Sequence, residues 1–289
     1  MRTAIIVDST AYLSGTTAQH PDVYRVDLTV NYSDGTTGLD AQGLNDQKEF
    51  YDRLLAEQTL PTTSQPTPGD YYRVMDDIVA KGYDAVFSIH LSSGISGTYQ
   101  TARMVTSEYA DRLKVFCIDS KAASVVMESL VEQTFALLEA GLTGEEIQEK
   151  LKWVAENARI YLMVEDLNNL VKGGRLNATG ALVGSLLKIR PVLFFDGEGK
   201  IVVFEKIRTN KKVYQRWLEL AQQRREMFPG GIRISFAHSN SLEETEVVRD
   251  MFKEELPDVS YHISGLGPVV GTHTGAGTKG CAIIPIALP

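Results

Sequence analysis

The sequence contains little of what defines several common classes of protein. Only two of its 289 residues are cysteines, Cys117 and Cys281, which lie far apart in apolar runs. This excludes a disulfide scaffold and predicts two buried free thiols in a reducing cytoplasm. No apolar run approaches the roughly 18–20 residues that span a bilayer, so we expect no integral membrane segment. The apolar run in residues 1–8 is too short for a signal peptide and ends at the acidic Asp8, so it instead predicts a first strand.

An excess of positive charge is also absent. Lys and Arg number 29 against 37 Asp and Glu, which leaves a formal net charge of −8 with neutral histidines. Because basic surfaces dominate nucleic-acid affinity, this balance argues against a nucleic-acid partner.

Most signatures of catalysis and metal binding are missing as well. The chain has no zinc-spaced Cys/His set, no HExxH, no Walker A loop and no Gly-x-Ser-x-Gly. We therefore expect no cofactor, no metal and no catalytic residue. Asp8 ends the first predicted strand, where a nucleophile, a metal ligand and a helix cap are all open. His90 lies inside a predicted strand, which is more typical of a hydrogen-bonded core histidine.

What is present indicates an α/β protein. In the first half, short apolar runs alternate with amphipathic stretches of helical spacing, a pattern that predicts a parallel sheet flanked by helices. The predicted strands are 2–8, 24–32, 84–91 and 114–119, and the predicted helices are 47–57, 69–81, 96–108 and 121–139.

The second half follows a helix over 143–157 that opens with the capping pattern Thr143-x-x-Glu146. Asp196-Gly197 between two apolar runs predicts a hairpin, so we expect a mixed or antiparallel sheet with helices here. We place an N-terminal α/β domain at 1–158 and a C-terminal α/β domain at 159–289. The predicted strands are 159–164, 189–195, 200–207, 231–238, 258–263 and 281–287, with helices at 211–226 and 242–255.

Four predicted loops are rich in small polar residues and glycine, namely 60–67, 91–100, 170–176 and 265–277. The first could bind a ligand, but Thr67 could equally cap the next helix. The second joins a strand to a helix, a geometry that suits both anion binding and capping. The third could be a helix end stopped by glycine, unless Arg175 points inward. In the fourth, His273 could be a site residue or an ordinary loop histidine.

The order of these motifs resembles the DegV family of bacterial fatty-acid-binding proteins. The resemblance covers nearly the whole chain and rests on six segments in sequence. They are Asp8-Ser9-Thr10, Thr63-Ser64-Gln65-Pro66, Ser92–Gln100, Phe116–Ser120, Lys172–Arg175 and Gly271–Gly275.

This resemblance implies a two-domain fold that binds a long-chain fatty acid. The acyl tail would lie in an apolar tunnel, largely in the C-terminal domain, with the carboxylate at the domain interface. The chain would present that carboxylate to a separate ATP-dependent fatty acid kinase subunit, which makes an acyl phosphate. The chain itself would have no enzymatic activity alone.

The same resemblance implies the residues that bind the carboxylate. Thr63 and Ser96 would bond it, with Ser93 and the backbone at Gly94 and Gly97 close by. His273 and Thr274 would face the head group, and Arg175 matches a basic position of the family. Such donors suit the physics, since a buried carboxylate without them would take up a proton.

The sequence also allows two other interpretations of the function. The serine–glycine loop and Lys172–Arg175 could bind a small phosphorylated metabolite, with Asp8 or His273 acting in a stand-alone phosphoryl- or acyl-transfer enzyme. A pure interaction module would hold no ligand. For the carrier, candidate tail contacts are 181–187 and 189–195, and Gly180 and Gly184 could leave room for a chain.

Overall fold

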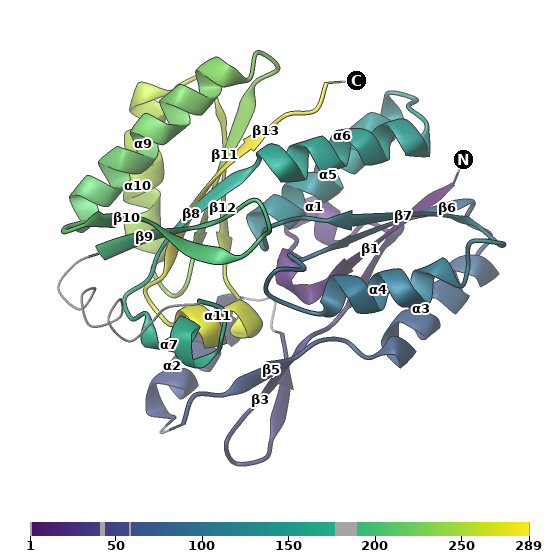
Figure 1. The fold of residues 1–289 in the computed structure, drawn as a ribbon, viewed down its shortest axis with the longest axis horizontal. Coiled ribbons are helices and arrows are strands. Elements are labelled where there is room, and N and C mark those ends of the chain that lie inside the picture. Colours follow the sequence, from purple (N-terminus) through teal and green to yellow (C-terminus); the bar gives the residue numbers. More distant parts are fainter. Residues whose placement is uncertain (1, 41–43, 58, 177–189, 289) are drawn as a thin grey trace.

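The computed structural model describes residues 2–40, 44–57, 59–176 and 190–288, and it contains two main sheets and a small third one (Figure 1). The first main sheet has the order β2-β1-β6-β7 and is parallel throughout, as the sequence predicts. Its strands are β1 (Thr3–Asp8), β2 (Val23–Val26), β6 (Ala85–His90) and β7 (Lys114–Asp119).

Helices cover both faces of this sheet (Figure 1). The helices α3 and α4 pack on one face through a core that includes Met75 and Val105, while α5 and α6 cover the other. Capping boxes start α3 at Thr67 and α6 at Thr143, so the expected caps are confirmed. The bounds are α3 (Pro68–Ala80), α4 (Thr98–Ser107), α5 (Val125–Glu139) and α6 (Gly144–Asn157).

The second main sheet is mixed and has the order β10-β9-β8-β13-β11-β12. The predicted hairpin is confirmed, since β9 and β10 pair antiparallel, and the one parallel pair here is β11 with β12. The helices α9 (Asn210–Met227) and α10 (Leu242–Glu255) cover its outer face. The strands are β8 (Arg159–Met163), β9 (Arg190–Phe195), β10 (Ile201–Ile207), β11 (Ile232–His238), β12 (Ser260–Gly265) and β13 (Lys279–Pro285).

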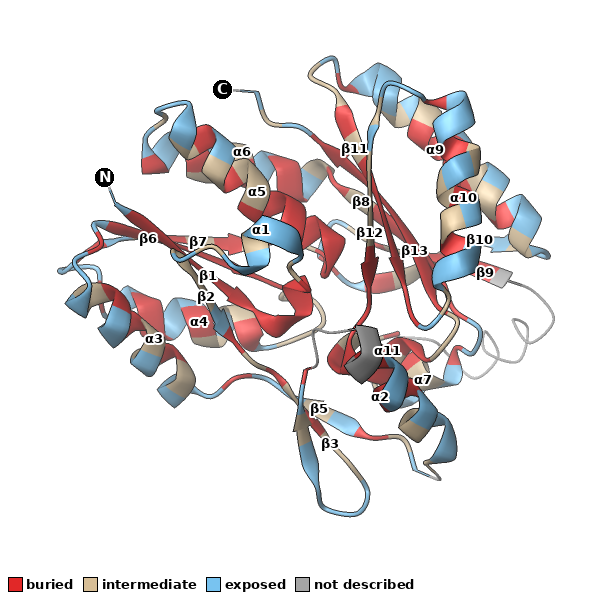
Figure 2. Cartoon of the chain, turned by 180° about the vertical axis from the view of Figure 1, so that it is seen from behind, coloured by how far each residue is buried: buried red, intermediate tan, exposed pale blue. Residues whose placement is uncertain are grey.

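The helices α5 and α6 lie between the two main sheets and pack against both (Figure 2). One continuous core therefore joins Ile89 of β6, Leu130 of α5 and Leu162 of β8. The proposed boundary near residue 158 falls between α6 and β8. The division into domains 1–158 and 159–289 stays a prediction.

A strand predicted over 24–32 is wrong as one element. The chain leaves the first sheet after Val26 and begins β3 at Thr29, in the third sheet of order β4-β3-β5. The turn is fixed at Leu28, whose backbone N–H donates to Ser9 Oγ at 3.1 Å. An alternation of polar and apolar residues persists through this turn, so the pattern gave no sign of it. The strands are β3 (Thr29–Asn31), β4 (Thr37–Leu39) and β5 (Thr62–Ser64).

The glycine-rich segment 265–277 was expected to be a loop, but its centre is a helix, α11 (Pro268–Thr274). Pro268 suits the first helical position, and Gly275, with φ of +78°, ends the helix. Inside α11, Gly271 lies against α2 (Leu44–Ala56), where a Cβ would come within 2.5 Å of Tyr51 Oη. Glycine at 271 is therefore explained by the close packing of α11 on α2 and not by a loop conformation.

The remaining short helices are η1 (Ser9–Ala11), α1 (Gly15–Ala18) and α7 (Asn168–Lys172). Asp8 caps η1 by accepting from the Thr10 backbone N–H at 3.1 Å, which is one of the three roles that the sequence left open for it. Over the described ranges, no helix is long and apolar enough to cross a bilayer. Both cysteines are free thiols, as expected, and Cys281 is buried as predicted, whereas Cys117 is only partly buried.

Candidate functional site

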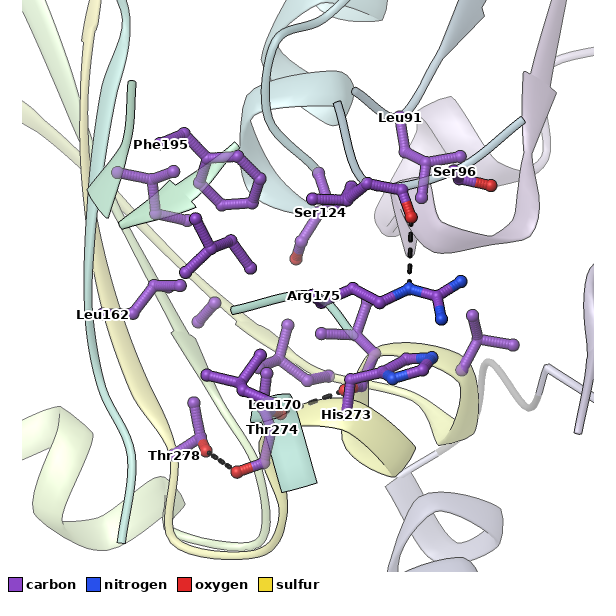
Figure 3. Close-up of a pocket in the computed structure, with 18 of the residues that line it drawn as sticks. Leu91, Ser96, Ser124, Leu162, Leu170, Arg175, Phe195, His273, Thr274 and Thr278 are labelled. Carbon is purple, nitrogen blue, oxygen red and sulfur yellow. Dashed lines mark hydrogen bonds between the residues drawn. The ribbon is translucent and has the colours of Figure 1, made fainter. Parts of the chain in front are cut away.

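An apolar cavity lies where α11 and the second sheet meet the loops of the first sheet (Figure 3). The free space inside it, with the open mouth included, is about 710 Å³. Among the described residues its walls are Leu28, Leu91, Ile95, Ala123, Ile160, Leu162, Leu170, Phe195, Ile201, Ala237, Leu266, Val269 and Val270. The polar lining residues are Thr63, Ser96, Ser124, Arg175, His273, Thr274 and Thr278.

Thr63 and His273 meet at this cavity although 210 positions separate them. Thr63 lies on β5 and His273 in the last turn of α11, with Oγ1 and Nε2 2.8 Å apart. The imidazole packs on Gly173, where a Cβ would lie 2.4 Å from Nδ1. Glycine at 173 is thus required for His273 to sit beside Thr63.

His273 is neutral at physiological pH. Burial, with the nearby positive charge of Arg175 as a smaller cause, lowers its pKa to about 4. Its Nδ1 is buried and has no hydrogen-bond partner among the described residues. When Nε2 carries the proton and donates to Thr63, the Thr63 hydroxyl is left able to donate to a ligand.

Arg175 points inward, and it also follows a helix end (Figure 3). Helix α7 stops at Gly173 and Gly174, and the Arg175 guanidinium then donates from Nε to Ile95 C=O at 3.2 Å and from Nη1 to Gly173 C=O at 2.6 Å. Burial is the only influence on its pKa, which is lowered, so among the described residues no carboxylate compensates its charge. This cation is the one charge that the described lining residues bring to the cavity at neutral pH.

Ser96 and Thr274 also line the cavity. Ser96 Oγ lies 2.8 Å from Thr98 Oγ1 and accepts from the Thr98 backbone N–H at 3.3 Å, just before α4, whose N-cap is Gly97. The Thr274 hydroxyl donates to Val270 C=O within α11 at 3.1 Å, which leaves its oxygen free only to accept.

Three residues named from the family pattern lie beside the cavity without lining it. The Ser93 hydroxyl donates to Asp119 Oδ2 at 2.5 Å. A Cβ on Gly94 would lie 2.5 Å from Gly199 C=O at the β9–β10 turn, and a Cβ on Gly97 would lie 2.2 Å from Gln65 Oε1. Both glycines permit close packing of the serine loop.

Ser124 and Thr278 are polar lining residues that the sequence analysis did not select. Thr278 donates to the Thr274 and Gly275 carbonyls and is satisfied locally. Ser124 precedes α5 after the strand β7, and serine at a strand–helix junction was the available signal. The tail contacts expected over 181–187, with Gly180 and Gly184, lie outside the described residues.

A Ser–His–Asp arrangement elsewhere does not form an active site. His90 Nε2 lies 2.7 Å from Ser88 Oγ, and His90 Nδ1 lies 3.1 Å from Asp8 Oδ2. All three side chains are 0% exposed, so no substrate can reach them, and His90 is the bonded core histidine expected. The described residues contain no group of three or more His, Cys, Asp or Glu that could hold a metal.

The fold and the cavity define an α/β protein with two main sheets and a mainly apolar interior site. The described residues that line this site also bring hydroxyls, a neutral histidine and an arginine that has no carboxylate partner among them. Residues 2–286 match the family described as "Uncharacterised protein, DegV family". Protein DegV of Bacillus subtilis is 36% identical over 282 residues, 97% of this chain and 98% of that protein. The chain belongs to the DegV family.

Solved structures agree with this assignment. The fatty-acid-binding DegV family protein SAG1342 from Streptococcus agalactiae has a TM-score of 0.90 at 32% identity and covers 99% of both chains. DegV of Bacillus subtilis, a fatty acid binding protein, has a TM-score of 0.87 at 35% identity over 98% of this chain and 99% of that one. The predicted α/β fold class is confirmed.

Proposed function

We propose that this protein binds a long-chain fatty acid in the described cavity. Thr63, Ser96 and Arg175 would hold the carboxylate, with His273 orienting the Thr63 hydroxyl toward it and Thr274 beside it. The observation that carries the proposal is Arg175, which is the one cation among the described residues that line the mainly apolar cavity and has no carboxylate beside it among those residues. Arg175 is partly buried and donates to two backbone carbonyls, and a ligand that is anionic at one end and apolar elsewhere would add the opposite charge.

The energetics of such a ligand are favourable at both ends. Each buried methylene contributes about 0.8 kcal/mol, so a long tail gains on the order of 10 kcal/mol before binding costs. The carboxylate loses water but gains hydroxyl and charge-assisted donors, which are the stronger kind of hydrogen bond. Fatty-acid binding by the DegV proteins of S. agalactiae and B. subtilis supports the same ligand class.

We further propose that the protein acts as a carrier for a separate kinase subunit. The motif resemblance implies that this partner uses ATP to phosphorylate the bound carboxylate. A carboxylate oxygen would bond to the γ-phosphorus as ADP leaves, which gives an acyl phosphate. The site residues need only hold and orient the carboxylate, since no proton has to be removed from it.

The first experiment is mass spectrometry of an organic extract of the protein purified from a bacterial host, with an unrelated protein as control. A fatty acid in stoichiometric amount is expected, and its identity gives the preferred chain. An empty extract, together with no uptake of added palmitate or oleate, would overturn the proposal. A phosphorylated small metabolite would then be the ligand class to screen.

Substitutions locate the head group. Thr63→Ala and Ser96→Ala should each weaken palmitate binding by about tenfold, since each removes one hydrogen bond to a charged group. Thr62→Ala, on the same strand but exposed, and Ser107→Ala, exposed on α4, are matched controls. Wild-type affinity in both site variants, and phosphate transfer at the wild-type rate with the kinase subunit, would show that the carboxylate binds elsewhere.

A further inference from the structure

Ser124 presents a buried hydroxyl to the cavity with nothing bonded to it. The residue is 2% exposed, it lines the cavity, and its Oγ has no hydrogen-bond partner among the described residues. Figure 3 shows this hydroxyl pointing into the cavity, between Phe195 on one side and Ser96 on the other. Buried hydroxyls in folded proteins are almost always hydrogen-bonded, so an unbonded one calls for an explanation.

The position of Ser124 makes the missing bond more unusual. Ser124 is the N-cap of α5, where a serine normally accepts a hydrogen bond from the first turn of the helix. In the same chain Thr67 and Thr143 cap α3 and α6 in this way. Ser124 does not, and its hydroxyl is turned from the helix toward the cavity.

A strained backbone holds the hydroxyl in that direction. Ser124 has φ of 56° and ψ of −127°, a conformation that non-glycine residues rarely adopt. Its N–H donates to Thr10 C=O at 3.0 Å and its C=O accepts from Glu128 N–H at 3.1 Å, so both backbone groups are fixed. Strain of this kind concentrates at ligand sites.

We infer that Ser124 recognises an oxygen on the acyl chain itself. This rests on the proposed function and names a ligand class within it, namely fatty acids that carry a hydroxyl near the carboxyl end. The carboxylate side of the cavity holds Ser96, Arg175 and His273, and Ser124 lies between them and the apolar wall at Phe195 (Figure 3). A chain hydroxyl there would give Ser124 its partner, whereas a plain methylene would leave it unbonded.

The test compares delipidated protein binding to hexadecanoic acid and to its 2-, 3- and 12-hydroxy derivatives. We expect the 2-hydroxy or the 3-hydroxy acid to bind about tenfold more tightly than hexadecanoic acid and its 12-hydroxy derivative. Ser124→Ala should abolish that preference and keep the affinity for hexadecanoic acid. Ser124→Gly relieves the positive φ and also lacks the hydroxyl, so it should lose the preference even when it is more stable than wild type. Ser241→Ala is the matched control, because Ser241 is also an N-cap serine whose side chain caps nothing but lies outside the cavity.

The outcomes separate this inference from the function it rests on. Equal affinity of the wild type for all four acids, or a preference that survives in both Ser124 variants, overturns the role of Ser124 while fatty-acid binding stands. No binding of any of the four acids overturns the proposed function itself.

Discussion

At the scale of single residues, we predict that Arg175 decides whether the cavity takes an acid or any apolar chain. Replacing it with methionine keeps an unbranched side chain and removes the charge, so palmitate affinity should fall by about tenfold or more. Hexadecanol, which has no charge, should bind the variant about as well as wild type. Competition with a fluorescent fatty acid measures both ligands.

Lys172→Met is the control for Arg175→Met, because Lys172 is an exposed cation three residues earlier in the same segment. It should leave both affinities unchanged. A methionine variant that still prefers palmitate over hexadecanol as strongly as wild type would mean that Arg175 does not face the carboxylate.

His273 makes the ligand-free protein sensitive to acid. Its pKa is lowered from 6.5 to about 4 in the folded protein. Between pH 6.5 and pH 4 this histidine is therefore protonated in the unfolded chain and neutral in the folded one. Stability contributed by neutral His273 is therefore present above pH 6.5 and is lost as the pH falls toward 4. His273→Gln should reduce this loss in the free energy of unfolding by on the order of 2–3 kcal/mol.

Urea unfolding of the two proteins at pH 7, 6, 5 and 4.5 measures this difference. His238, whose pKa is also lowered to about 4 by burial and by Lys279, adds a loss of the same sign in both proteins. The glutamine variant must therefore retain part of the slope. If it retains all of it, His273 is already charged in the folded state at mildly acidic pH.

At the scale of elements, helix α11 depends on close contact with α2. Gly271→Ala should destabilise the protein by about 1–3 kcal/mol, although alanine is the better helix former, because the new Cβ would lie 2.5 Å from Tyr51 Oη. Tyr51 would also have to move from Leu266 C=O, which its hydroxyl reaches at 2.7 Å. Thermal and urea unfolding measure the loss.

Gly69→Ala is the counterpart at an exposed position of α3. Its Cβ would meet only Thr67 Oγ1, at 3.6 Å, so alanine should be neutral or stabilising by up to about 1 kcal/mol. Equal effects of the two substitutions would show that α2 and α11 are not in tight contact.

Pattern reasoning identified elements whose signals are local. Thr143 and Glu146 predicted the start of α6, and Asp196-Gly197 predicted the β9–β10 hairpin, because capping boxes and tight turns are specified by neighbouring residues. The helix around Gly271 was missed because its glycine is explained by Tyr51, 220 positions away in sequence. No local pattern contains that contact.

The site shows the same limit. Motifs pointed to Thr63, Ser96, Arg175 and His273, and the structure brings these four to one cavity. Ser124 was missed because it looks like an ordinary helix cap, and only its strained backbone turns the hydroxyl away from α5. The direction of a side chain depends on φ and ψ, which a single sequence does not state.

At the scale of the whole molecule, the shared layer of α5 and α6 makes the two sheets depend on each other. Leu130 of α5 is fully buried in the core that contains residues of both sheets. Leu130→Ala should therefore lower the free energy of unfolding by about 2–5 kcal/mol and should weaken both sheets together. Hydrogen exchange of peptides from β6 and β13, followed by mass spectrometry, reports on each sheet separately.

Where exchange requires global unfolding, Leu130→Ala should speed hydrogen exchange in the β6 and β13 peptides by the same factor relative to wild type. The reason is that one cooperative unfolding transition controls both peptides. Leu55→Ala removes a leucine that is 74% exposed on α2 and should change stability by less than about 0.5 kcal/mol. Faster exchange in β6 alone would mean that residues 1–158 and 159–289 unfold independently. Their junction, the cavity lined by Thr63, Ser96, Arg175 and His273, would then open without loss of either half.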